Sequence, residues 1–183
     1  MQISPDLDRR FRDAAAAGGL LDAAYDLVDS PVGTLLVAAT DRGLCRIAYT
    51  PDPDALAAAL GPRVLRVPSR LAPARRQLDE YFAGERRVFD LPVDLRVPAF
   101  QRDVLRELAR VPFGALATYG ELARRIGKPR AARAVGGALN RNPVPIVLPC
   151  HRVVGARGAL VGYAGGLDRK RTLLALEGAG TRE

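Results

Sequence analysis

The chain has few residues of the kinds that build metal sites and disulfide scaffolds. Among its 183 residues are two cysteines, Cys45 and Cys150, and one histidine, His151. Two cysteines are too few for a disulfide scaffold or a four-cysteine zinc site, and one histidine excludes a site of two cysteines and two histidines. No uncharged apolar run approaches the ~20 residues of a membrane span, so we expect no transmembrane segment. Residues 1–12 are charged and no apolar stretch follows them. We therefore expect no secretory signal and a cytoplasmic location.

The composition is typical of a globular protein, with 48% hydrophobic and 26% charged residues. The length fits one large domain or two small ones. Charge is distributed unevenly: residues 1–96 carry 13 basic and 14 acidic residues, whereas residues 97–183 carry 15 basic and 6 acidic. The net charge of +9 in the second part favours an anionic partner, most commonly nucleic acid. A solvated basic surface would give the same count.

The first part of the chain predicts a mixed α and β domain. Residues 7–24 favour a helix that Gly18 and Gly19 end. Residues 54–60 and 73–82 also favour helices, the second with Pro73 in its first turn. Between the first and second of these helices, turn residues separate short apolar runs. These runs predict an antiparallel meander of strands over residues 24–28, 35–39 and 44–49.

After a proline-flanked break at residues 91–98, the pattern becomes helical. Apolar residues recur at helical spacing over residues 100–108. Thr118 precedes Glu121 by three residues, which is the capping-box spacing and predicts a helix over residues 119–126. A turn and a further helix over residues 131–139 complete a helix-turn-helix pattern.

The helix predicted over residues 131–139 contains two adjacent glycines, Gly136 and Gly137. Each costs ~1 kcal/mol relative to alanine in a helix interior. Such a smooth face suits either a tightly packed second helix or the close approach of a nucleic-acid groove, with Arg133 projecting beside it. The helical pattern alone favours neither interpretation.

The segment from Asn142 to Gly155 is the strongest candidate for chemistry. Three prolines within seven residues exclude a helix and predict a stiff, extended approach to Cys150. A thiol with a free pKa of ~8.5 needs a base or positive surroundings to react well, and His151 follows directly. Because neighbouring side chains of an extended chain point to opposite faces, a direct pair requires a sharp bend, and otherwise a bridging water.

A third group should orient the imidazole of His151. Glu177 is a candidate because it follows an apolar run near a predicted helix C-terminus, where a histidine or cationic partner would offset the unfavourable helix dipole. The alternative for Cys150 is an inert buried thiol, since free cysteines are among the most buried residues. Cys45, inside a predicted strand, fits that description.

Several ordered motifs resemble one family. Pro149-Cys150-His151-Arg152-Val153 is similar to the active-site motif of the O6-alkylguanine-DNA alkyltransferases, also called methylated-DNA–protein-cysteine methyltransferases. Residues 131–138 resemble that family's recognition helix, and residues 142–145 resemble the hinge before its nucleophile. The resemblance is dense over residues 97–178 and looser upstream, and its other matching segments are residues 29–33, 78–84, 119–123, 162–166 and 173–178.

The resemblance implies a single-turnover DNA repair enzyme. Cys150 would take the alkyl group from O6-alkylguanine, and from O4-alkylthymine, in one irreversible transfer after the base flips out from the minor-groove side. His151 would act as base through a water, Glu177 would orient the imidazole, and Asn142 would hold the hinge. The residues implied to contact the base and the DNA are Tyr119, Ala132, Arg133 as the inserted side chain, Ala134, Gly136, Leu139, Val153, Tyr163 and Ala164.

The resemblance also implies an α+β fold of two domains. Residues 1–93 would form a ribonuclease H-like domain with a small antiparallel sheet and helices, preceded by an unassigned extension before about residue 25. Residues 97–183 would form a winged helix-turn-helix-like domain that binds DNA and accepts the alkyl group. We expect a monomer without an obligate protein partner, a cofactor or a metal, and double-stranded DNA with alkylated guanine as its partner. Ala164 stands where other members have serine or glycine, and we expect this difference to alter the tolerance of the site for bulky alkyl groups.

Two alternatives from other functional classes remain at this point. A lesion-binding module would recognise the damaged base with an unactivated thiol and transfer nothing. A Cys-His-Glu hydrolase would turn over repeatedly and would have no use for Arg133 or for the smooth face at Gly136 and Gly137.

Overall fold

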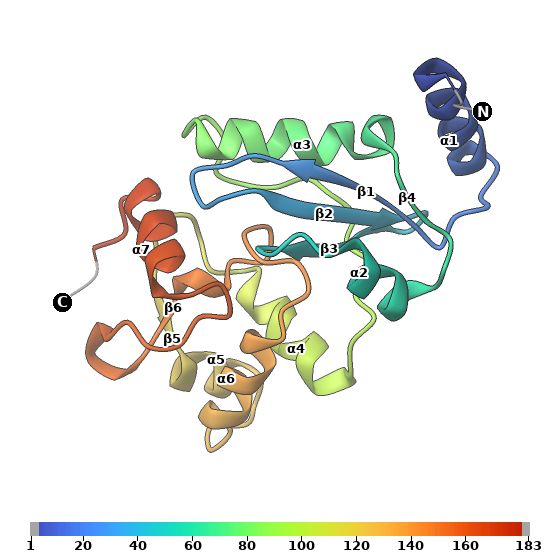
Figure 1. The fold of residues 1–183 in the computed structure, drawn as a ribbon. Helices are drawn as coiled ribbons and strands as arrows, with labels where there is room; N and C mark the ends of the chain where they lie inside the picture. Colours follow the sequence, from blue (N-terminus) through green and yellow to red (C-terminus); the bar gives the residue numbers. More distant parts are fainter. Residues whose placement is uncertain (1–3, 181–183) are drawn as a thin grey trace. The chain divides into compact units, whose positions relative to one another are not determined.

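The computed structural model describes residues 4–180, and the chain divides into two compact units, Met1–Asp94 and Leu95–Glu183 (Figure 1). Both units combine helices with strands, so the predicted α+β class is confirmed. No helix within residues 4–180 combines the length and apolar character needed to cross a membrane.

The first unit is built around one four-stranded sheet in the order β3-β2-β1-β4. β1, β2 and β3 are successive antiparallel strands, which confirms the predicted meander. β4 runs parallel to β1 and pairs Ala23 with Val64, so the sheet is mixed. The elements of this unit are α1 (Pro5–Ala17), β1 (Ala23–Val28), β2 (Leu35–Thr40), β3 (Gly43–Ala48), α2 (Pro53–Leu60), β4 (Val64–Arg66) and α3 (Pro68–Phe82).

Helices cover the sheet of the first unit, and α3 lies along it in Figure 1. Leu36, Ala38 and Cys45 form a buried cluster with Leu56 of α2. Because side chains alternate along a strand, the buried Leu35 and Val37 point to the other face, and α3 packs on β1 and β2. Cys45 is therefore a core residue of this unit.

The helix α3 corrects one expectation. It begins at Pro68, so Pro73 lies inside the helix and not in its first turn. Pro68 occupies the start of the helix, where a missing backbone N–H costs nothing. Its buried Gln77 exchanges two hydrogen bonds with the backbone of Asp90, at 2.9 and 2.8 Å, and so ties α3 to the segment after it.

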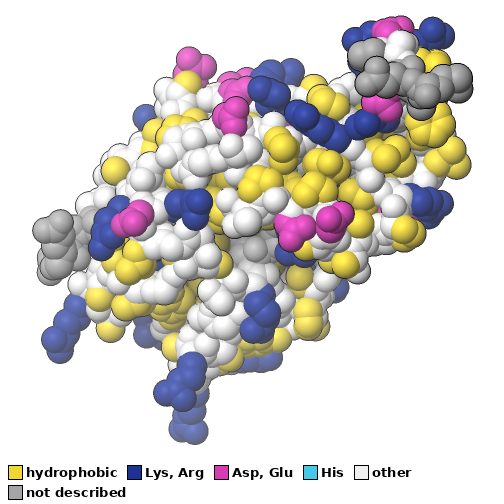
Figure 2. All heavy atoms as spheres, viewed as in Figure 1, with side chains coloured by type: hydrophobic (Ala, Val, Ile, Leu, Met, Phe, Trp, Pro, Cys, Tyr) yellow, Lys and Arg dark blue, Asp and Glu magenta, His cyan; other side chains and the backbone are white. Residues whose placement is uncertain are grey.

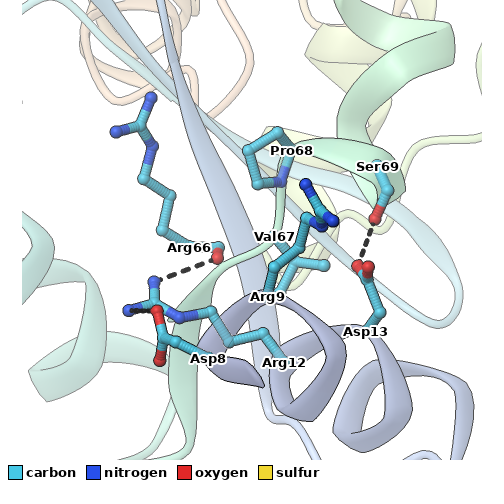
Figure 3. A pocket seen from close by; sticks show the side chains of 8 residues that line it. All are labelled: Asp8, Arg9, Arg12, Asp13, Arg66, Val67, Pro68 and Ser69. Carbon is cyan, nitrogen blue, oxygen red and sulfur yellow. Dashed lines mark hydrogen bonds and ion pairs between the residues drawn. The ribbon is translucent and has the colours of Figure 1, made fainter. Parts of the chain in front are cut away.

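α1 ends where Gly18 and Gly19 were predicted to end it, and it does not continue to residue 24. It ends at Ala17, with Gly18 as its C-cap, and β1 begins at Ala23. Figure 3 shows how α1 meets the start of α3: Ser69 Oγ donates to Asp13 at 2.6 Å, and Arg12 donates to the Arg66 carbonyl at 3.3 Å. A cavity of about 360 Å³ lies between these segments.

The second unit places short strands among helices. α4, α5 and α6 contact one another, and α7 packs on the η1 turn. β5 and β6 pair in parallel, with Ala117 opposite Val153. The elements of this unit are α4 (Ala99–Leu108), β5 (Ala117–Thr118), α5 (Tyr119–Arg125), α6 (Ala132–Asn140), the 3₁₀ turn η1 (Cys150–Arg152), β6 (Val153–Val154), the 3₁₀ turn η2 (Ala156–Gly158) and α7 (Leu167–Leu176).

Local hydrogen bonds fix the helix-turn-helix of α5 and α6. Thr118 caps α5 and forms the predicted capping box with Glu121, whose carboxylate accepts from the Thr118 backbone N–H at 2.6 Å. These hydrogen bonds hold the pKa of Glu121 below its ordinary value. At the far end of α6, the buried Gln101 of α4 donates to the carbonyls of Ala138 and Arg141. α6 is thereby anchored at the end that leads to Cys150.

Candidate active site

Cys150 opens a tight turn, not an extended segment. Residues Cys150–Arg152 form η1, and the stiff approach through Pro149 ends there, which corrects the expectation of an extended chain at the nucleophile. The turn supplies the bend that adjacent side chains need in order to serve one site. Cys150 is 6% exposed and His151 is fully buried.

Asn142 connects the end of α6 to this turn. Its side-chain Nδ2 donates to the Leu148 carbonyl at 2.8 Å and to Cys150 Sγ at 3.2 Å, while its Oδ1 accepts from Val144 N at 3.1 Å. Between these contacts Ile146 is fully buried with a φ of 76°, a backbone conformation that costs energy for a β-branched residue. The segment is thus held by packing in one strained shape around the thiol.

The imidazole of His151 forms a hydrogen bond with Glu177. Its Nε2 lies 2.8 Å from Glu177 Oε1, which places the proton on Nε2 and leaves Nδ1 as an acceptor. Within residues 4–180, Nδ1 is the buried side-chain nitrogen or oxygen left without a hydrogen-bond partner. A buried polar atom without a partner is costly, so this atom suits a bound water or a proton from the reacting group.

Glu177 also accepts from Arg152. It is the C-cap of α7, and its carboxylate takes hydrogen bonds of 2.8 and 2.9 Å from the Arg152 guanidinium and 3.2 Å from Gly114 N. Arg152 donates further to the Val111 carbonyl at 2.6 Å and stacks over Phe113. The charge of this buried carboxylate is therefore balanced by a guanidinium, while the carboxylate orients the imidazole.

Burial governs the ionisation of the two reactive side chains. It raises the pKa of the Cys150 thiol above its ordinary value, against hydrogen bonds from Asn142 and Tyr163 and the charge of Lys170, which lower it. It lowers the pKa of His151, against the opposing effect of Glu177. Near neutral pH the pair is therefore a neutral thiol and a neutral imidazole, the combination in which a base can take the thiol proton.

Tyr119 and Tyr163 lie beside the thiol. Tyr119 is the first residue of α5, its hydroxyl donates to the Val161 carbonyl at 3.2 Å, and burial together with Cys150 raises its pKa. Tyr163 hydrogen-bonds to Cys150. The fully buried Val153 begins β6 directly after the turn, and Ala164 is exposed near Tyr163 in sequence. Tyr119 and Tyr163 therefore reach Cys150 from two different segments of the second unit.

The predicted face of α6 borders a cavity of about 630 Å³ that the residues Thr118, Tyr119, Gly120, Arg124, Ala132, Arg133, Gly136 and Ala156 line. Leu139 is buried, and Ala134 and Arg133 are exposed. A Cβ on Gly136 would meet the Tyr119 ring at 3.6 Å. Figure 2 shows Lys and Arg side chains projecting from the surface over α5 and α6. The cavity and the surrounding positive charge make this face suitable for binding a polyanion.

Two contributors to the site were not among the predicted residues. Arg152 lies inside the motif that carries Cys150, but its pairing with Glu177 depends on contacts 25 residues apart. Lys170 is fully buried, which its neighbours Arg169 and Arg171 gave no reason to expect. The sequence did offer one indication that Lys170 is unusual, because lysine is rare in this chain, which has two lysines and 26 arginines. Within the described residues, no group of three or more His, Cys, Asp or Glu side chains is placed to hold a metal ion.

Family models match both units of the chain. Residues 23–95 match the ribonuclease-like domain of 6-O-methylguanine DNA methyltransferase, and residues 99–179 match its DNA-binding domain. The methylated-DNA–protein-cysteine methyltransferase of Mycolicibacterium paratuberculosis is 49% identical over 156 residues, covering 84% of this chain and 91% of the relative. That of Methanosarcina acetivorans is 42% identical and covers 85% and 98%.

Among solved structures, the O6-methylguanine methyltransferase of Mycobacterium tuberculosis has a TM-score of 0.76 at 42% identity, covering 85% of this chain and 93% of that one. Its complex with DNA has a TM-score of 0.77 at 41% identity, covering 85% and 92%. The predicted ribonuclease-like and DNA-binding folds are thereby confirmed. The chain belongs to the 6-O-methylguanine DNA methyltransferase family.

Proposed function

We propose that this protein repairs DNA directly, by transferring the alkyl group of O6-alkylguanine irreversibly to Cys150. The observation that carries the proposal is the connected arrangement of a buried thiol, a neighbouring imidazole with an unpartnered Nδ1, and a carboxylate that orients that imidazole. Family membership supplies the reaction class, and a relative that matches 85% of this chain was crystallised with DNA. Each molecule acts once, because a thioether does not return to a thiol.

In the transfer, the sulfur of Cys150 attacks the alkyl carbon, the S–C bond forms, and the C–O6 bond breaks with its electrons moving to O6. The thiol proton passes to His151 Nδ1 through a bridging water. Guanine leaves as an anion and regains a proton, so that it is restored in its normal form. Glu177 stabilises the imidazolium that exists between these proton transfers, as an oriented carboxylate does in other nucleophile–histidine sites.

The base must leave the stack before its O6 substituent can reach the buried thiol. Tyr119 would donate its hydroxyl to the base, and the Val153 carbonyl and the Tyr163 and Ala164 segment would line the pocket. Leu139, at the end of α6, would form its wall. The same pocket would take O4-alkylthymine, because the alkylated oxygen of that base presents the same carbon to sulfur.

The face of α6 would approach the DNA along the minor groove. The side chains of Ala132, Ala134 and Gly136 are small or absent, so the helix backbone can come close to the groove. The Arg133 side chain is exposed and is free to enter the DNA. An inserted side chain that fills the space of the extruded base stabilises an opened step. Phosphate contacts from the basic residues of the second unit would supply affinity that depends on salt but not on sequence.

Intact mass after incubation with duplex DNA that contains one O6-methylguanine tests the proposed function. We expect a gain of one methylene per protein molecule, mapped to the peptide that contains Cys150, with Cys45 unmodified as an internal control. A hydrolase would release product repeatedly without gaining mass. Lesion-selective binding with no mass gain would instead identify a lesion-binding module, and either result would refute the transfer.

Arg133→Ala is expected to slow repair in duplex DNA by about ten- to a hundredfold, because base extrusion costs a few kcal/mol and the inserted side chain offsets part of that cost. Attack on a free alkylated guanine base should be nearly unchanged. The matched control is Arg171→Ala, which removes an exposed arginine of α7 that pairs with Asp168. Equal losses on duplex and free base in Arg133→Ala would exclude a role in extrusion.

A further inference from the structure

The cavity of about 630 Å³ beside α6 is lined by two residues that have different places in the proposed reaction. Tyr119 lies next to Cys150, and Arg133 is the side chain expected to enter the duplex. When the alkylated base is at Cys150 and Arg133 fills the space that the base has left, the sugar and phosphates of that nucleotide must run between these two residues. The cavity is therefore the place where the backbone of the extruded nucleotide passes the protein.

Most of the other residues that line this cavity carry no charge and little bulk. They are Gly120, Ala132, Gly136 and Ala156. Thr118 also lines the cavity, but its hydroxyl is used within the protein, because it accepts from Glu121 N at 3.1 Å and donates to the Glu121 carboxylate at 3.0 Å. These walls allow a sugar to come close, and they offer no positive charge to a phosphate.

Arg124 brings a second guanidinium to this cavity. It lies in the last turn of α5, and its side chain is exposed. Glu121, the carboxylate one turn earlier on the helix, is engaged by the backbone N–H and the hydroxyl of Thr118. Once Arg133 has entered the duplex, Arg124 is the cation that remains to meet a phosphate among the described residues that line the cavity.

Arg125, the next residue of α5, shows what access to the cavity adds. Arg124 and Arg125 are both exposed, and both lower the pKa of Glu121. Arg125, however, is not among the described residues that line the cavity. Consecutive residues of a helix point in different directions. Two arginines with the same charge at the same helix end therefore differ in whether they can reach a phosphate inside the cavity.

We propose that Arg124 binds a phosphate directly beside the extruded nucleotide and thereby favours the extruded state of the damaged base. The inference rests on the proposed function and names a residue that holds its substrate. A guanidinium can donate two parallel hydrogen bonds to a phosphate, so it fixes the position of the phosphate and balances its charge. Because this phosphate reaches the cavity only when the nucleotide is extruded, the contact distinguishes the extruded from the stacked state, and only such a difference shifts the equilibrium between them.

Equilibrium binding of Cys150→Ala tests this contact without transfer. The duplexes contain one O6-methylguanine and one uncharged methylphosphonate linkage, placed directly 5′ or directly 3′ of the lesion. We expect one of the two positions to weaken binding by at least about tenfold, because it removes the charge that the guanidinium binds. In Cys150→Ala/Arg124→Gln, the same linkage should change binding by less than about twofold, because its partner is already absent.

The matched control is Cys150→Ala/Arg125→Gln. It removes the same charge from the next residue of α5, and glutamine is as good a helix former as arginine. In this control the sensitive linkage should keep its full effect on binding. If the linkage acts equally in the Arg124→Gln and Arg125→Gln proteins, or if neither position weakens binding, Arg124 does not bind a flanking phosphate and the proposal is wrong.

Transfer kinetics give a second measurement, with Cys150 intact. In Arg124→Gln, the ratio of the transfer rate on duplex DNA to the rate on a free alkylated guanine base should fall by about tenfold, because the free base has no phosphate to bind. An unchanged ratio would contradict the proposal. Failure of the proposed function would look different, because no methylene would be gained from damaged DNA while the coupling between Arg124 and the flanking linkage is still present in Cys150→Ala.

Discussion

Cys150→Ala is expected to abolish alkyl transfer completely and to leave binding to duplex DNA with O6-methylguanine roughly unchanged. The sulfur is the nucleophile, and the other polar groups around it have acceptor or orienting roles that cannot replace it. Stability should fall by only ~1 kcal/mol. The reason is that Asn142 Nδ2, which loses its bond to Sγ, keeps its 2.8 Å bond to the Leu148 carbonyl.

The matched control for this variant is Cys45→Ala. Cys45 is equally buried, at 6% exposure, but it belongs to the core of the first unit and has no histidine beside it. The Cys45→Ala variant should transfer the alkyl group at the native rate. Intact mass and a binding measurement on the same lesion-containing duplex check both variants. A methylene gained by Cys150→Ala, or lost lesion binding in that variant, would contradict the assignment of Cys150 as acceptor alone.

The features that the sequence predicted well are those set by neighbouring residues. The capping box of Thr118 and Glu121 needs only three residues of separation, and its hydrogen bonds are present. The meander of β1, β2 and β3 follows from short apolar runs between turn residues. The proximity of His151 and Glu177 was expected from the resemblance and from the helix end at Glu177, and the structure places them 2.8 Å apart.

The features that were missed depend on contacts between distant residues. β4 has three residues, none of them buried, and it is defined by parallel pairing with β1 about 40 residues earlier. Pro73 resembled a helix start, but the start is set by Pro68 and by the packing of α3 on the sheet. The prolines before Cys150 predicted a stiff, extended approach. Cys150 instead opens a turn, whose shape is decided by Asn142 and by the packing around Ile146. Burial of Lys170 likewise needs two distant carbonyls.

Glu177→Gln is expected to lower the free energy of unfolding by about 3–5 kcal/mol, because removing one partner of a buried ion pair leaves the other charge uncompensated. Here that charge is the Arg152 guanidinium, which is 6% exposed and bonded to Glu177 through two nitrogens. The glutamine carbonyl can still accept from His151 Nε2, so the imidazole keeps its orientation but loses a negative neighbour. Transfer should therefore slow by at least about tenfold, since the imidazolium that forms is less stabilised.

Urea unfolding of Glu177→Gln and of Glu107→Gln gives the matched comparison. Glu107 pairs with Arg110 at 2.6 Å, closer than the 2.8 Å of Glu177 and Arg152, but the Arg110 side chain is 74% exposed. The surface pair should be worth less than about 1 kcal/mol. If distance decided the strength of these pairs, Glu107→Gln would cost at least as much as Glu177→Gln, and that result would contradict the prediction.

The double variant Arg152→Met/Glu177→Gln separates stability from chemistry. Removing both charges takes away the uncompensated guanidinium, so the double variant should recover part of the stability that Glu177→Gln loses. It should not recover the rate of transfer, because the imidazolium of His151 still has no carboxylate beside it. Recovery of both would mean that Glu177 acts only by balancing Arg152. Recovery of stability alone would assign the carboxylate two separate tasks, one in the fold through Arg152 and one in the reaction through His151.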